Sequence, residues 1–148
     1  METLNLKEIY MKKALDEAQK AFDEDEVPIG AIIVCNNKIV GKGYNQTEKL
    51  KDVTAHAEML AITAAALTIN SKYLEECELY VTIEPCVMCM GAIKNSRISK
   101  VYIGGKEPKT GNSKFIDLAE FAPKIEIETG ILEKESVAMM QHFFQEKR

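Results

Sequence analysis

Two short stretches carry the side chains best suited to chemistry. The stretch TAHAEML places His56 two residues before Glu58, and EPCVMCM places Cys86 and Cys89 three residues apart. One imidazole and two thiolates form a ligand set that suits zinc. A structural zinc site would require a fourth protein ligand, whereas three ligands leave one position for water, as in catalytic sites. The sequence therefore predicts one catalytic zinc per subunit, held by His56, Cys86 and Cys89.

Glu58 is better suited to proton transfer than to metal binding. The pattern HxE followed by PCxxC is the known signature of zinc deaminases, in which the glutamate is the general acid and base. Other fourth ligands are poor candidates, because Cys35 and Cys77 belong to predicted strands or their edges and His142 lies near the chain end. A redox role for the CxxC pair would fit the same strand-then-helix context, so the spacing of the cysteines alone does not decide.

Two helices must begin close to the metal for these side chains to meet. Residues two apart point about 200° apart around a helix, so His56 and Glu58 can approach one point only near a helix start. We expect Thr54 to cap a helix that runs to about residue 67. Pro85 suits the first position of a second helix, which we expect to end near residue 95.

The remaining pattern predicts an α/β sheet protein, and we expect residues 1–148 to form a single domain. Apolar spacing predicts a helix over residues 5–24 with Asn5 as its cap, and Asn36-Asn37 predicts a hairpin between two strands. We expect loops at 45–53 and 107–114. Further strands are expected at 77–83, 100–105 and 124–128, and further helices at 115–121 and from residue 132.

Composition and charge limit the class of protein and the compartment in which it is expected. The chain has 148 residues, 46% of them apolar and 28% charged, which is typical of a globular protein. No signal peptide or membrane-spanning stretch is apparent, so we expect a cytoplasmic protein with its four cysteines reduced. The net charge is −4, with an acidic run DEDE at 23–26, yet residues 94–114 hold six basic residues and one acidic residue. That basic segment is a candidate for phosphate contacts, or simply a solvated surface.

With these residues in view, the sequence resembles the cytidine deaminase superfamily, and most closely the bacterial tRNA-specific adenosine deaminases. The resemblance rests on segments spread over almost the whole chain: EVPIGAIIV, GYN, TAHAE, EPCVMCMGA, KTG, GIL and the terminal FF. It implies a three-layer α/β/α sandwich with a central five-stranded mixed sheet, a homodimer, and zinc-dependent hydrolysis of adenosine to inosine at the wobble position of the tRNA anticodon. Glu58 would move a proton from the zinc-bound water to the adenine ring.

The resemblance also implies which residues bind substrate. Asn45 resembles the asparagine that hydrogen-bonds the target base. The apolar wall around that base would include Val27, Pro28, Ile29 and Ala57, and the flanking nucleotides would lie along Glu107, Lys109 and Thr110. At the C-terminal end, Phe144 and Arg148 resemble residues that touch the anticodon loop. Glu107, where the family often has Asp, and the sequence NSKF after Gly111 depart from the family pattern.

Two other functions are compatible with the motif. Guanine deaminases share the HAE and EPCxMC segments, so a small-molecule purine or nucleoside deaminase is the main alternative. A zinc-stabilised binding module without activity is the other, and Glu58 together with the missing fourth ligand argues against it.

Overall fold

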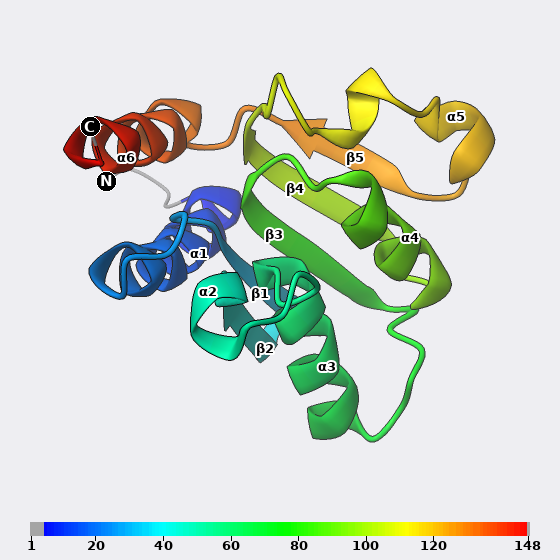
Figure 1. Cartoon of the computed structure of the whole chain (residues 1–148). Coiled ribbons are helices and arrows are strands. Elements are labelled where there is room, and N and C mark those ends of the chain that lie inside the picture. The colour runs from blue at the N-terminus through cyan, green and yellow to red at the C-terminus, as the bar shows by residue number, and fades with distance from the viewer. Residues whose placement is uncertain (1–4, 148) are drawn as a thin grey trace.

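The computed structural model describes residues 5–147, in which five strands form one mixed sheet in the order β2-β1-β3-β4-β5 (Figure 1). The strands are β1 (Gly30–Cys35), β2 (Lys38–Tyr44), β3 (Cys77–Ile83), β4 (Lys100–Gly105) and β5 (Glu126–Thr129). β1 runs antiparallel to both β2 and β3, while β3, β4 and β5 are parallel to one another. The predicted five-stranded mixed sheet is therefore confirmed.

Helices cover both faces of the sheet, which confirms the three-layer sandwich (Figure 1). One layer contains α3 (Ala57–Ile69) and α4 (Val87–Asn95). The opposite layer contains α1 (Leu6–Asp23), which packs on β1, and α6 (Glu133–Glu146), which contacts β3 and β4. Shorter helical turns lie in connections: α2 (Thr47–Leu50), η1 (Asn112–Lys114) and α5 (Leu118–Phe121). Within the described range, none of the helices has the length and hydropathy needed to cross a membrane.

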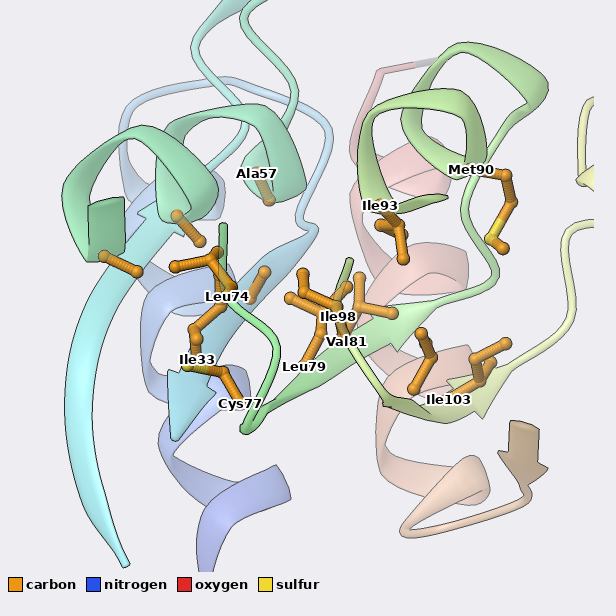
Figure 2. Close-up of a cluster of buried hydrophobic side chains, with 14 of the residues drawn as sticks. Ile33, Ala57, Leu74, Cys77, Leu79, Val81, Met90, Ile93, Ile98 and Ile103 are labelled. Atoms are coloured by element: carbon orange, nitrogen blue, oxygen red, sulfur yellow. The ribbon is translucent and has the colours of Figure 1, made fainter. Parts of the chain in front are cut away.

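β3 supplies side chains to both layers because successive residues of a strand point to opposite faces. Leu79 and Val81 join the cluster under α3 and α4, which also contains Met90 and Ile93 of α4 (Figure 2). Tyr80 points the other way and stacks on Tyr102 with 4.3 Å between ring centroids, beneath α1. The metal-ligand helices are thus fixed to the sheet by a fully buried apolar cluster.

Glycines let two helices approach the sheet closely. A Cβ atom on Gly30 would collide with the backbone of α1, at the carbonyl oxygen of Ala14 and the nitrogen of Ala18. One on Gly43 would meet the backbone of α3, at the carbonyl oxygen of Ala57. The start of α3, where His56 lies, is therefore held by direct backbone-to-backbone packing on β2.

Several predicted boundaries need correction. Thr54 does not cap α3, because its own N–H and hydroxyl bind the Asp52 carboxylate, and His56 occupies the N-cap position. Pro85 lies outside α4, which starts at Val87 with Cys86 as N-cap. The segment 45–53 is not wholly irregular, since it contains the single turn α2. By contrast, the Asn5 cap and the Asn36-Asn37 hairpin are confirmed, the latter with φ of 51° and 61°.

A disulfide joins Cys35 to Cys77, so the expectation that all four cysteines are reduced was wrong for this pair. The two residues are direct partners in the β1–β3 pairing, with 4.4 Å between Cα atoms. Cys86 and Cys89 are free thiols. The strand register, which the sequence did not reveal, is what brings Cys35 and Cys77 together.

Reducing this disulfide is expected to lower the free energy of unfolding by about 4 kcal/mol, because the bond closes a long loop in the unfolded chain. The two cysteines are 42 residues apart in sequence, and the closed loop includes His56 and Glu58. Denaturant unfolding with and without reductant measures the difference. A Cys35→Ala/Cys77→Ala variant should show no response to reductant, and four titratable thiols in unreduced, denatured protein would contradict the disulfide.

Candidate metal centre and pocket

The metal-ligand candidates come from two helix starts on the same face of the sheet. His56 is the N-cap of α3 and Cys86 is the N-cap of α4, both with extended backbone. Neither side chain caps its own helix by a hydrogen bond, so both remain available for other partners. Cys89 follows in the first turn of α4 and is fully buried. Helix starts favour thiolate, the form of cysteine that binds metal.

The three side chains converge as a tetrahedral zinc site requires. The Nδ1 atom of His56 lies 3.6 Å from the Sγ of Cys86 and 3.4 Å from the Sγ of Cys89. With bonds of about 2.3 Å to sulfur and about 2.0 Å to nitrogen, tetrahedral zinc separates such ligands by about 3.5 Å. All ligand atoms of the three residues lie within 4.8 Å of one another. The donor set and its spacing therefore fit zinc.

Hydrogen bonding within the cluster favours a thiolate at Cys86 beside a protonated imidazole at His56, and the hydrogen bond with Cys86 raises the pKa of Cys89. The hydrogen bond with the Cys89 thiol, followed by that with His56, lowers the pKa of Cys86 to about 4. The hydrogen bond with Cys86 raises the pKa of His56. The site thus already stabilises a thiolate at Cys86 near neutral pH.

Glu58 lies in the first turn of α3, next to the metal ligands and almost completely buried, with 3% of its surface exposed. Burial raises the pKa of its carboxyl to about 7. A carboxyl with a pKa close to neutral can both accept and return a proton at physiological pH. Its position beside the thiol–imidazole cluster suits a proton carrier.

A pocket of about 320 Å³ opens onto this cluster and contains Glu58, His56 and Cys86 in its wall. Most of the predicted substrate residues line it: Val27, Ile29, Asn45, Ala57, Glu107, Thr110 and Phe144. Pro28 is buried and does not line it, and Lys109 lines an adjoining groove instead. Arg148 lies outside the described residues. The geometry brings together segments from positions 27 to 144 around one opening.

Four lining residues were missed in the sequence: Thr47, Ile83, Glu84 and Met140. Ile83 and Glu84 stand at the end of β3, where the chain leaves the sheet for the metal-ligand helix. Because they come directly before PCxxC in the sequence, both residues could have been predicted to line the pocket. Met140 on α6 carries no local signal, because only tertiary packing places it near residue 83.

The acidic run at 23–26 holds together two chain segments that line the pocket. Glu26 is 1% exposed, and its carboxylate accepts hydrogen bonds from the backbone N–H groups of Glu48 and Lys49, at 3.1 and 2.7 Å. Glu24 accepts a hydrogen bond from the Tyr44 hydroxyl at 2.7 Å. These contacts tie the strip containing Val27 and Ile29 to the strip containing Asn45 and Thr47. Glu24 and Glu26 therefore join the pocket segments, whereas Asp23 and Asp25 are bound by Gln19 and Lys147.

The basic segment 94–114 does not form one continuous basic strip. Arg97 pairs with Glu75 and shares a cavity with Lys94, away from the pocket. Lys100 pairs with acidic residues of β5. By contrast, Lys106 and Lys109 line a groove of about 810 Å³ between the loop after β4 and helix α6. This groove shares Ile83, Glu107, Met140 and Phe144 with the pocket, so basic charge reaches the site from one side.

Comparison with known proteins identifies relatives over most of the chain. The family described as the cytidine and deoxycytidylate deaminase zinc-binding region matches residues 4–105. The tRNA-specific adenosine deaminase of Aquifex aeolicus is 55% identical over 71% of this chain and 70% of its own length. That of Bacillus subtilis is 42% identical over 95% of this chain and 90% of its own. A solved structure from work on A-to-I editing by tRNA:A34 deaminases at the wobble position is 37% identical, with a TM-score of 0.81, over 88% of this chain and 98% of its own.

Proposed function

We infer that the chain, which belongs to the tRNA-specific adenosine deaminases within the cytidine and deoxycytidylate deaminase family, converts adenosine to inosine at the wobble position of tRNA anticodons. The deamination chemistry is supported by a buried carboxyl, Glu58, placed beside three zinc ligands in the wall of a pocket. The tRNA substrate is supported by the 42% identity to a tRNA-specific adenosine deaminase over 95% of this chain. Zinc is the cofactor, and the enzyme is a hydrolase acting on the C–N bond of the adenine amidine.

We assign the proton transfers of the reaction to Glu58. When bound by His56, Cys86 and Cys89, zinc supplies a Lewis acid that makes water acidic enough to react near neutral pH. The Glu58 carboxylate accepts the proton that water loses and donates it to the adenine ring nitrogen. The hydroxide that remains adds to C6 of adenine, and Glu58 then carries the proton of this new hydroxyl to the 6-amino group. The bond between C6 and the amino nitrogen breaks, ammonia leaves, and the oxygen becomes the C6 carbonyl of inosine. The near-neutral pKa of Glu58 suits both directions of transfer.

We assign recognition of the base to Asn45 and the apolar wall. The Asn45 side chain is 7% exposed and lines the pocket. Its Nδ2 donates to the carbonyl of Val27 at 3.4 Å, whereas among residues 5–147 its Oδ1 has no hydrogen-bond partner. A buried acceptor without a partner is costly, so a donor from the substrate would be favourable here. The base must leave its stack to enter the pocket, which is easiest in a single-stranded loop.

The function is tested by offering zinc-loaded protein a tRNA with an A-C-G anticodon, with free guanine and cytidine in parallel. Inosine at the first anticodon position, read as G after reverse transcription, is the expected product. Ammonia release from guanine with unchanged tRNA would instead support the small-molecule alternative.

Binding of tRNA is expected to weaken as salt increases, because Lys106 and Lys109 lie in the groove that continues the pocket. Each phosphate contact to single-stranded RNA contributes about 0.7 to the slope of log affinity against log salt. Lys109→Ala should therefore lower that slope by about 0.7. Lys124→Ala is the matched control, since Lys124 lines a different cavity. An unchanged slope for Lys109→Ala would remove this lysine from the RNA-binding surface.

We further propose that residues 1–148 act as one deaminase domain, in a cytoplasmic homodimer. Exposed apolar side chains close in sequence to the metal ligands suit burial by a second subunit: Leu50, Val53, Val87 and Met88. Val53, with 84% of its surface exposed, is the most informative position. Sedimentation equilibrium measures the mass of each protein in solution. The unmodified protein should have the mass of a dimer, and Val53→Glu should shift it toward the monomer. A monomeric unmodified protein would contradict the proposal.

A further inference from the structure

A buried carboxylate closes the loop that follows β4. Glu84 is 9% exposed and lies directly after β3. One of its oxygens accepts a hydrogen bond from the backbone N–H of Glu107 at 3.3 Å, and the other accepts from Ser113 at 2.9 Å. These two donors stand at the two ends of residues 107–113, which we call the 107–113 loop. A single side chain thus joins both ends of the loop.

The same loop is attached to the start of the metal-ligand helix. The backbone N–H and the side-chain amide of Asn112 donate to the carbonyl of Pro85 at 3.0 and 2.8 Å. Gly111 forms an isolated β-bridge with the zinc ligand Cys86. The 107–113 loop therefore contacts three consecutive residues, Glu84, Pro85 and Cys86. Because of these contacts, a shift of the loop would also shift Cys86.

Gly111 is required for the loop to close around the carboxylate. A Cβ atom at this position would lie 2.5 Å from both the Cδ and the Oε1 of Glu84, and 2.5 Å from the carbonyl oxygen of Glu107. No side chain larger than hydrogen fits without moving the loop or Glu84. By contrast, a Cβ on Gly91 in α4 would meet nothing within 4 Å, which makes Gly91 a matched control.

The side chains at the tip of the loop do not hold it in place, because Pro108, Lys109 and Thr110 are exposed. Ordering seven residues has a large entropic cost, which hydrogen bonds to a charged, buried acceptor can offset. We propose that Glu84 is a positioning residue that holds the 107–113 loop ready for the nucleotides flanking the target base. This rests on the proposed function of the loop in binding RNA.

The kinetic test compares Glu84→Ala, Glu84→Gln and Gly111→Ala with Gly91→Ala and the unmodified enzyme, all at full zinc occupancy. Glu84→Ala and Gly111→Ala should raise KM for tRNA by about tenfold or more, with a smaller change in kcat, because the loop must be ordered by the substrate. Glu84→Gln keeps one acceptor oxygen and should restore part of the loss. KM values within twofold of the unmodified enzyme for both Glu84→Ala and Gly111→Ala would overturn the proposal.

Amide hydrogen exchange gives a second readout that needs no substrate. The N–H groups of Glu107 and Ser113 should exchange faster in Glu84→Ala, while those of α3 stay protected. If the unmodified protein proved inactive on tRNA, the proposed function would fail, yet the exchange rates would still decide whether Glu84 holds the loop. Unchanged exchange at Glu107 and Ser113 would overturn that role.

Discussion

Replacing Glu58 with glutamine is expected to reduce turnover of tRNA by about 10²- to 10⁴-fold, the usual contribution of a general acid and base. Glutamine has nearly the same shape as glutamate but cannot accept and return a proton. Because Glu58 is not one of the three converging ligands, zinc content should stay at the level of the unmodified enzyme. Single-turnover inosine formation and metal analysis of the same sample measure both quantities.

The matched control is Glu133→Gln, which makes the same chemical change on the exposed first turn of α6. It should leave turnover unchanged. A Glu58→Gln enzyme with the full rate and normal zinc would show that another group moves the protons. If both zinc and activity were lost, Glu58 would instead be required for zinc binding.

Replacing Cys89 with serine is expected to remove both the metal and the activity. Cys89 is fully buried at 3.4 Å from the Nδ1 of His56, so a weaker oxygen ligand would take the place of a thiolate at the centre of the cluster. Zinc should fall from about one per chain to a small fraction after gel filtration. The melting temperature should fall as well, because metal that binds only the folded state adds stability, about 4 kcal/mol at a thousandfold excess over Kd.

The other two cysteines of the chain provide a control for Cys89→Ser. Cys35→Ser/Cys77→Ser removes the other two sulfurs and should leave zinc bound, although it removes the disulfide. A chelator should reproduce the loss of activity in the unmodified enzyme, and added zinc should restore it. Retention of a full complement of zinc by Cys89→Ser would exclude this thiol as a ligand.

Local patterns were enough to predict much of the fold. Apolar spacing located α1, and paired asparagines located the hairpin, because both depend on neighbouring residues alone. The cap of α3 was misplaced because Thr54 is a good capping residue in general, yet here its side chain is engaged by Asp52. Pro85 was similarly placed inside α4, whereas the backbone turns one residue later at Cys86.

The site was predictable where chemistry dictates residue types and unpredictable where packing decides. The convergence of His56, Cys86 and Cys89 followed from the ligand preferences of zinc. The disulfide depends on the register of β1 and β3, and the contribution of Met140 depends on where α6 crosses the sheet. Such relations join residues far apart in sequence, and no short motif encodes them.

The order of these parts along the chain has a consequence for biosynthesis. All three zinc ligands precede residue 90, whereas Met140 and Phe144 close the pocket from the last helix. Since a ribosome delivers the N-terminal part first, a nascent chain presents its complete set of metal ligands before the final wall of the pocket has been synthesised. Zinc acquisition can therefore precede competence for RNA, because the pocket is complete only after α6 has been synthesised.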